Sequence, residues 1–475
     1  MSFFWRYSLP LLPLPFLLLA LWREPGWSVE LPWLLFGSVW GVDELRHTFL
    51  LLTALLWTAA GVFASGYLKP RHLCRFWLFW ALTLAGNLGL VIAQDIASFY
   101  SFFALMTFAG YGLVVHEGAA EANRAGRVYL AMAVAGEMAI LTGLLMAAQQ
   151  AGSGLLADLP AAIADADRRW LMMLLLLSGF GVKAGLPLLH FWLPLAHPVA
   201  PTPASAVLSG AMIKAGLLGW LVTLPFGEVS LPGWGNALVV LGAVGSLGGA
   251  LLGVRQQRPK AVLAYSSISQ MGLITLMVGA ALANTELAAP LFAVIGLYVL
   301  HHGLAKGSLF LSTAMALPAG RSGQWLFWVL VALPGLSLSG LPFTSGAASK
   351  LAMKELLRPE NFEFAPAPYL PALMSAGAVA TMLLVWRFLW LQRAAAGVGS
   401  NFGFMWLGWG LATISSLVLF WLLPWPGAVP DKAWPHTMVA EAWSLFWPIL
   451  LASIVAFVAV SSARRGFLCI RGFWF

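Results

Sequence analysis

Apolar runs of about 20 residues recur from one end of this chain to the other, and such a run crosses the core of a bilayer as an α-helix. Of the 475 residues, 60% are hydrophobic and only 9% are charged, whereas soluble domains carry about 25% charged residues. So few charges cannot cover a water-facing surface. The sequence therefore predicts an all-α polytopic membrane protein.

Division of the chain at its charged and Gly/Pro-rich segments predicts about fourteen transmembrane helices, with boundaries uncertain by about two to four residues. The predicted spans are 7–22, 45–68, 76–93, 97–116, 126–148, 170–190, 202–225, 235–254, 260–283, 290–317, 325–357, 367–392, 402–423 and 437–461. The first run has no small-residue cleavage site after it, so we expect a retained helix. The apolar segment from Leu31 to Gly41 is too short to span, and we expect a loop or an interfacial piece there.

The charges in the connections support this division. Alternate connections and both ends of the chain are rich in Lys and Arg, for example Arg6, Arg71, Arg124, Arg255, Arg321, Arg465 and Arg471. The other connections hold most of the acids, for example Glu24, Asp95, Asp165, Glu286, Glu363 and Asp431, beside a few bases such as Lys432. Because basic residues stay on the cytoplasmic side, we expect a multi-pass protein of the cell inner (plasma) membrane with both termini cytoplasmic.

When the charges in the connections and near the span ends are set aside, four lysines and one glutamate are left at or near membrane depth: Lys183, Lys214, Lys306, Lys350 and Glu137. A lysine at the bilayer centre costs about 2.5–3.5 kcal/mol on insertion scales. Burial disfavours the charged form, so a change in nearby charge can load or unload the proton. Each lysine alone could be a structural pair or reach the interface. Four of them with few acidic partners favour a proton relay.

Histidines can extend such a relay because imidazole titrates near neutrality. His302 lies four residues before Lys306, so the two project from one helix face. His190 lies near the end of its span, and a structural role and a relay role are equally expected for it. His301 and His197 are expected to be structural.

Two predicted spans contain a proline close to a lysine. Pro187 follows Lys183 in KAGLPLL, and Pro342 precedes Lys350 in SGLPFTSGAASK, so that the two breaks resemble each other as AGLPLL and SGLPFT. Proline interrupts the helical hydrogen bonds, and such breaks persist at membrane depth only inside protein or beside a water-filled cavity. The matching breaks predict two inverted five-helix repeats. The expected divisions are 1–75 (N-terminal helices), 76–225 (first repeat), 235–392 (second, inverted repeat) and 393–475 (C-terminal helices).

Several long motifs occur in one order: GNLGLVIAQDIASFY, GVKAGLPLLHFWLPLAHPVAPTPASAVLSGAMIKAG, RPKAVLAYSSISQMG, HGLAKGSLFL and GLPFTSGAASK. Between about Gly86 and Arg387 they resemble the antiporter-like subunits of respiratory complex I, membrane-bound hydrogenases and Mrp-type antiporters. The resemblance implies two inverted repeats, each with a broken helix, and a central axis of lysines and histidines.

The resemblance also assigns individual positions. It implies that Lys183 is the lysine of the first broken helix, and that Lys214 is the polar residue of the next helix. His302 with Lys306 would form the relay of the second half, and Lys350 would be the terminal proton carrier. Arg387 falls where the family often has an arginine, and we regard it as an accessory residue.

One position departs from the family pattern. The family usually has a glutamate where this chain has Ala104, and that glutamate pairs with the first lysine. Glu137 lies in the middle of the next span, in YLAMAVAGEMAIL. We expect Glu137 to supply the displaced carboxylate for Lys183, although it could instead be satisfied by backbone or hydroxyl groups. If it does not pair with Lys183, the first half would be a scaffold.

The leading hypothesis is a proton-translocating subunit of a multi-subunit energy-converting complex, with other membrane and soluble subunits as partners. Three alternatives stay open. One is an Mrp-type Na⁺/H⁺ antiporter subunit, and another is the membrane subunit of a two-component inorganic-carbon (CO₂ or bicarbonate) uptake system driven by a cation gradient. The third is a non-conducting scaffold, which the loss of the glutamate at Ala104 would favour.

Other functions lack a sequence signal. The chain has no Walker loop, no GxGxxG motif that opens a helix after a strand, and no cysteine cluster, since Cys74 and Cys469 are far apart. We expect no cofactor, no metal and no catalytic redox site in this chain. The net charge of +8 is spread over short connections, so a nucleic-acid partner is not expected.

Overall fold

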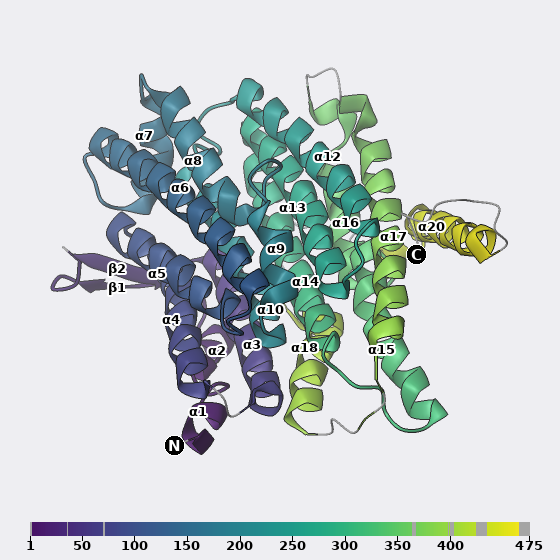
Figure 1. Ribbon diagram of the computed structural model, residues 1–475. Helices are drawn as coiled ribbons and strands as arrows, with labels where there is room; N and C mark the ends of the chain where they lie inside the picture. Colours follow the sequence, from purple (N-terminus) through teal and green to yellow (C-terminus); the bar gives the residue numbers. More distant parts are fainter. Residues whose placement is uncertain are drawn as a thin grey trace. The chain divides into compact units, whose positions relative to one another are not determined.

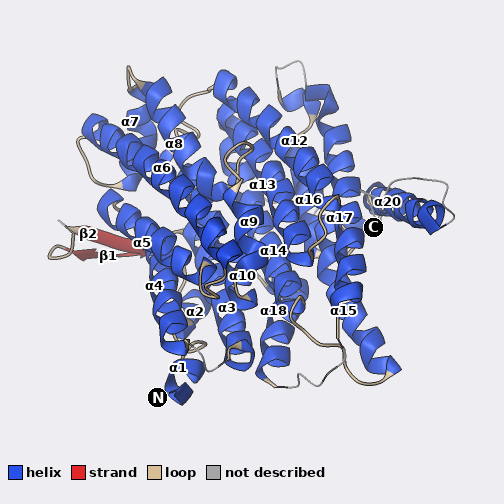
Figure 2. Ribbon diagram, in the orientation of Figure 1, coloured by secondary structure: helices blue, strands red, loops and turns tan. Residues whose placement is uncertain are grey.

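The computed structural model describes residues 2–35, 37–69, 72–362, 367–397, 399, 403–423 and 435–464. Helices make up most of the described residues, as predicted (Figures 1 and 2). By their internal contacts they divide into two compact units. One unit comprises Met1–Leu231 and Gly403–Trp409, and the other comprises Pro232–Phe402 and Gly410–Phe475. The chain passes from one unit to the other between the seventh and eighth predicted spans. Arg71, Glu363, Asp431, Lys432, Arg465, Cys469 and Arg471 lie outside the described residues.

The first unit contains the helices of the first predicted repeat. Its elements are α1 (Ser2–Tyr7), α2 (Leu14–Trp22), β1 (Trp27–Leu31), β2 (Ser38–Val42), α3 (Glu44–Tyr67), α4 (Leu73–Ile92), α5 (Ile96–Val114), α6 (Ala120–Ala151), α7 (Leu159–Asp165), α8 (Arg169–Ala184), α9 (Trp192–Val199), α10 (Thr202–Val207) and α11 (Ile213–Thr223). A π-helical turn, Leu208–Met212, joins α10 to α11. The α3 helix and the α10–α11 segment are almost entirely buried and form the centre of this unit.

The second unit contains α12 (Pro232–Val254), α13 (Pro259–Ala283), α14 (Ala288–Ser312), α15 (Arg321–Ser339), α16 (Ser345–Leu356), α17 (Leu370–Ala395), α19 (Pro435–Met438) and α20 (Ala442–Arg464). Helix α18 (Phe404–Leu422) begins in the first unit and continues in the second. The α13 helix is buried almost throughout, whereas α12, α15 and α20 keep an apolar face exposed. In a bilayer this face suits lipid contact. Helix α20 crosses α17 at a steep angle (Figure 1).

Twelve helices of the described chain are long and apolar enough to span a membrane, compared with about fourteen predicted. The predicted span 7–22 is divided between the short helices α1 and α2, and prolines at positions 10, 13 and 15 explain the division. The predicted span 170–190 appears as α8 and a following irregular segment. The remaining predicted spans each correspond to one of the twelve, with 325–357 divided into α15 and α16.

A β-hairpin occupies the segment where we expected a loop or an interfacial piece. Strands β1 and β2 pair antiparallel, with Trp27 opposite Val42. The carboxylate of Asp95, the N-cap of α5, accepts hydrogen bonds from the backbone N–H of Val39 (2.8 Å) and of Ser98 (2.7 Å). These bonds join the hairpin to the N-terminal end of α5. The apolar pattern of the segment could not predict them, because the acceptor lies in a distant part of the chain.

The two predicted helix breaks share one backbone geometry. Helix α8 is followed by Gly185 at φ +78°, and α15 is followed by Gly340 at φ +94°. In each case Leu-Pro follows, and the next residue, Leu188 or Phe343, also has a positive φ (70° and 62°). Such values are strained for residues with a β-carbon. Both helix breaks thus occur where they were predicted and have the same backbone geometry, while the division into two inverted repeats stays a prediction.

Glycines allow α12 and α13 to pack closely. A β-carbon at Gly242 of α12 would lie 2.6 Å from the carbonyl oxygen of Gly272 and 2.6 Å from the backbone nitrogen of Leu276 on α13. By contrast, a β-carbon at Gly248 of α12 would meet nothing within 4 Å. Close approach through small residues is a common way for membrane helices to associate.

Gly242→Ala should therefore destabilise the protein by about 1–3 kcal/mol, because backbone atoms cannot yield as a flexible side chain can. The matched variant Gly248→Ala should keep or slightly raise stability, since alanine favours a helix. Thermal unfolding in detergent micelles would compare the two. Equal melting temperatures would contradict the close packing of α12 on α13.

Candidate functional site

The five ionisable residues predicted at membrane depth all lie inside the protein. Their exposed fractions are 3% for Glu137, 5% for Lys183, 1% for Lys214, 0% for Lys306 and 7% for Lys350. None of them therefore faces lipid or reaches an interface along a helix surface. Because a buried charge is costly without a partner, the contacts of each amine show how its position is stabilised.

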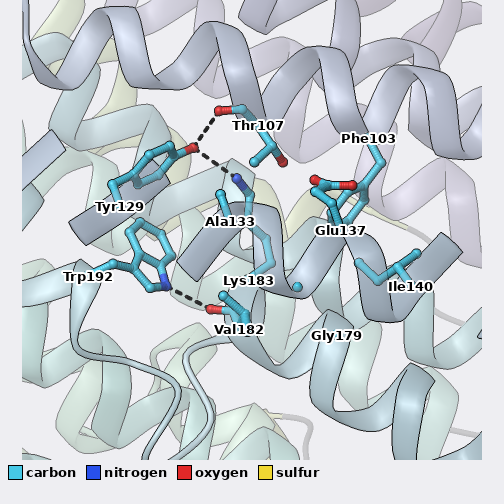
Figure 3. A pocket seen from close by; sticks show the side chains of 11 residues that line it. Phe103, Thr107, Tyr129, Ala133, Glu137, Ile140, Gly179, Val182, Lys183 and Trp192 are labelled. Carbon is cyan, nitrogen blue, oxygen red and sulfur yellow. Dashed lines mark hydrogen bonds between the residues drawn. The ribbon is translucent and has the colours of Figure 1, made fainter. Parts of the chain in front are cut away.

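Lys183 lies in the last turn of α8, just before the first helix break. Its Nζ donates a hydrogen bond to the hydroxyl of Tyr129 (3.2 Å), which in turn donates to the carbonyl oxygen of Thr107 (2.8 Å) (Figure 3). The same Nζ lies 5.4 Å from the ring centre of Tyr129 and 5.8 Å from that of Trp192. These distances are within the range of cation–π interactions. Two aromatic rings and one hydroxyl therefore surround the amine.

Glu137 shares a cavity of about 20 Å³ with Lys183, which is room for about one water molecule. Neither carboxylate oxygen has a hydrogen-bond partner among the described residues, but the two charges interact electrostatically. In Figure 3 the carboxylate of Glu137 and the amine of Lys183 both point toward Thr107. Ala104 does not line this cavity. The carboxylate nearest Lys183 therefore comes from α6, while α5 contributes Thr107.

Trp192 links Lys183 to the other side of the helix break. It is the first residue of α9, and its indole N–H donates to the carbonyl oxygen of Val182 (2.7 Å) on α8. His190 lies in the irregular segment between these helices and is half-buried, outside the cavity that Lys183 and Glu137 line. The structure therefore does not bring His190 into this group.

Lys214 lies directly after the π-helical turn. In this turn the N–H of Ile213 donates to the carbonyl oxygen of Leu208, five residues earlier. The carbonyl oxygen of Ser209, which an α-helix would have used, instead accepts a hydrogen bond from Lys214 Nζ (2.7 Å). A single π turn inside an α-helix often marks a functional position. Here it supplies the acceptor for a buried amine.

In the second unit Lys306 is held by backbone. Its Nζ donates to the carbonyl oxygen of Leu263 on α13 (3.0 Å). His302, fully buried one turn earlier on α14, faces the ring of Tyr298 at 6.3 Å. The Tyr298 hydroxyl hydrogen-bonds to Gln270. The predicted pair of His302 and Lys306 is therefore buried, with polar groups of α13 and α14 close to each member.

His301, which we expected to be structural, reaches the second helix break. Its Nδ1 lies 2.8 Å from the hydroxyl of Ser345, the first residue of α16. Sequence reasoning also missed Tyr129, Thr107 and Trp192. Only their position near Lys183 reveals them, because an aromatic or hydroxyl residue in an apolar run gives no separate signal.

Lys350 and Arg387 have different surroundings. The Nζ of Lys350 has no hydrogen-bond partner among the described residues, and it lines a cavity of about 30 Å³. Arg387 donates from Nε and Nη2 to the carbonyl oxygen of Gln256 (3.0 and 2.9 Å) and from Nη2 to the side chain of Gln257 (2.9 Å). Arg387 therefore secures the connection between α12 and α13.

The structure therefore gathers the predicted residues into separate groups. Glu137 with Lys183 forms one, and Lys214, the pair of His302 and Lys306, and Lys350 each have their own surroundings. Among the described residues, no three His, Cys, Asp or Glu side chains gather as metal ligands would.

Comparisons with known proteins agree with these features. The family model described as "NADH:quinone oxidoreductase/Mrp antiporter, TM" matches residues 93–357. Hydrogenase-4 component B of Escherichia coli (strain K12) is 31% identical over 281 residues, which are 57% of this chain and 42% of that protein. The chain thus spans less than half the length of this curated relative.

Two solved structures have the same fold. A chain of the Mrp complex from Dietzia sp. DQ12-45-1b aligns with a TM-score of 0.79 at 22% identity, covering 97% of this chain and 53% of that one. A chain of the membrane-bound sulfane sulfur reductase, an archaeal respiratory membrane complex, aligns with a TM-score of 0.71 at 25% identity, covering 88% and 72%. With the match to more than half of its length, this chain belongs to the NADH:quinone oxidoreductase/Mrp antiporter family of membrane subunits.

Proposed function

We propose that this chain translocates protons as one subunit of a multi-subunit energy-converting membrane complex. Protons pass through groups carried by Lys183, Lys214, His302, Lys306 and Lys350, and Glu137 acts as the carboxylate partner of Lys183. The observation that carries the proposal is the burial of four lysine amines inside the protein at membrane depth. Intramembrane ionisable residues are costly and typically mark ion or proton pathways.

The contacts of these amines suit proton exchange. Three of them donate to neutral oxygen atoms, namely the Tyr129 hydroxyl and two backbone carbonyls. A direct buried ion pair would hold a lysine firmly in its charged form, because opposite charges attract strongly in a low-dielectric interior. Neutral acceptors leave the lysine free to give up its proton when a neighbouring charge changes.

The energy source must be a partner. Movement of one charge across 100 mV costs about 2.3 kcal/mol, and the sequence shows no nucleotide or redox site. Membership of the family, and the membrane complexes to which its relatives belong, support association with further membrane and soluble subunits. We place the complex in the inner (plasma) membrane, with the basic connections and both termini on the cytoplasmic side.

A Na⁺/H⁺ antiporter is the second candidate, and the fold match to the Mrp complex over 97% of this chain favours it. In vesicles that contain the assembly, a sodium gradient should then drive a pH change without any other energy source. A pH change under an imposed voltage, with no response to sodium, would support the proton-only function. A pH-sensitive dye inside the vesicles measures both.

Lys350→Ala removes the terminal amine and should lower proton flux by about 100-fold, the scale on which a positioned proton-transfer group acts. Lys69→Gln is the matched control, because Lys69 is exposed in a connection. The protein is purified with its bound subunits, reconstituted into vesicles and driven by a potassium potential. Full flux in Lys350→Ala would contradict the proposed pathway, and no flux in the unmodified assembly would identify a scaffold.

Glu137→Gln should lower flux by about tenfold or more, because the amide cannot exchange a proton with the cavity beside Lys183. Glu121→Gln, an exposed change on the same helix, is the control. Adding Ala104→Glu to Glu137→Gln should restore part of the flux by returning a carboxylate to α5. If Glu137→Gln keeps full flux, Glu137 is a structural residue.

A further inference from the structure

The cavity beside Lys350 lies among α15, α16, α17 and α20 of the second unit. It measures about 30 Å³ and is lined by Lys350, Lys354, Ser339, Ser375 and Ser444 together with apolar residues. This volume holds about two water molecules. The amine of Lys350 is buried, borders the cavity and has no hydrogen-bond partner among the described residues. A cavity with three serines and a second lysine in its lining therefore adjoins the one lysine of the four for which the described residues provide no acceptor.

The three serine hydroxyls of this cavity have their protons already engaged. Ser339 donates to a carbonyl of α15 (3.2 Å), and Ser375 donates to a carbonyl of α17 (3.0 Å). Ser444 lies 2.9 Å from both the carbonyl oxygen and the carboxylate Oε2 of Glu441. Each hydroxyl has one proton but two lone pairs. The oxygens are thus left as acceptors, which suit an ammonium group or a protonated water.

A proline in α20 adds one more acceptor. Pro448 lines the same cavity and lies within the helix. Proline has no N–H, so the carbonyl of Ser444, four residues earlier, loses the donor that a regular helix would supply. Both the hydroxyl and the carbonyl of Ser444 can therefore accept a proton donor at this position.

A second, larger cavity of about 220 Å³ is lined by Leu351, Lys354, Glu355, Arg358, Pro371 and Glu441. Lys354 lines both cavities, and the contact between Ser444 and Glu441 joins a residue of one to a residue of the other. Arg358 forms an ion pair with Glu355 (2.5 Å). Lys354 and Glu441 are therefore the charged groups at the boundary between the small cavity and the large one.

We propose that Lys350 exchanges its proton with the membrane surface through the Ser444 cavity, with Glu441 as the receiving group at its mouth, beside Lys354. The Lys350 ammonium passes a proton to a water, and that water passes one of its protons to the Glu441 carboxylate. Water is neither consumed nor formed. This inference rests on the proposed function, and it makes α20 part of the proton path.

The mouth opens on the face predicted to be non-cytoplasmic. The residues of the larger cavity lie in or near the connection between α16 and α17 and at the start of α20. Lys354, Glu355 and Glu441 lie near the ends of the predicted spans 325–357 and 437–461, where long side chains can reach the interface. If Lys354 only reached the interface, it would not need to line the cavity of Lys350 as well, but it lines both cavities.

Flux measurements on the assembly in vesicles test the role of Glu441. Glu441→Gln should lower proton flux by about tenfold, whereas Glu441→Asp, which keeps the carboxylate, should stay within about twofold of the unmodified protein. Glu286→Gln, an exposed change on the same predicted face, is the control. Full flux in Glu441→Gln would overturn the inference, as would an equal loss in Glu441→Asp.

Thiol labelling tests the opening independently of flux. Ser444→Cys is introduced together with Cys74→Ser and Cys469→Ser, and a small charged methanethiosulfonate that cannot cross membranes is added to one side. Labelling from the predicted outer face and loss of flux after labelling are expected. No labelling from that face would overturn the inference.

The two proposals fail in different ways. If Lys350→Ala stops flux but Glu441→Gln and labelling of the Ser444→Cys thiol do not, only the exit route is wrong. If Lys350→Ala leaves flux unchanged, the proposed function fails and the exit route with it.

Discussion

A positive charge at membrane depth needs an oxygen acceptor, because lipid provides none and an unpaired buried charge is costly. The arrangement of this protein follows from that need. In the interior of a regular α-helix each carbonyl is already bonded to an N–H four residues later, so it has only its second lone pair to offer. A buried lysine therefore needs a helix irregularity, a second acceptor bond to a neighbouring helix, or a hydroxyl.

The structure uses each of these solutions. The π turn before Lys214 releases the carbonyl of Ser209, and Leu263 on α13 accepts a bond from Lys306 across the helix interface. Lys183 uses a tyrosine hydroxyl and two aromatic faces next to the break in α8. The π turn is therefore an irregular segment that directly supplies an acceptor to a buried amine.

Sequence reasoning could predict what composition and periodicity record. It identified the membrane class, most of the spans, both helix breaks and the buried lysines, because length, proline and charge are visible in the chain. It could not identify the π turn or the hydroxyl of Tyr129, since neither changes the apolar pattern of its helix. The first predicted span was wrong because hydropathy alone ignored Pro13 and its neighbouring prolines, which keep the helix short. His301 could not be connected with Ser345 from the sequence, because only the packing of α14 against α16 brings the two side chains to 2.8 Å.

In the proposed relay, Glu137 keeps a carboxylate beside Lys183 although Ala104 stands where the family resemblance implies a glutamate. A carboxylate at position 104 would lie on α5, whereas Glu137 lies on α6. The cavity beside Lys183 nevertheless has an acid in its lining. The cavity that the two side chains share has room for about one water molecule, and no direct hydrogen bond joins the carboxylate to the amine. The attraction between two charges weakens with distance and with water between them. In the proposed relay, the separation and hydration of the two groups set how strongly the carboxylate holds the proton on Lys183.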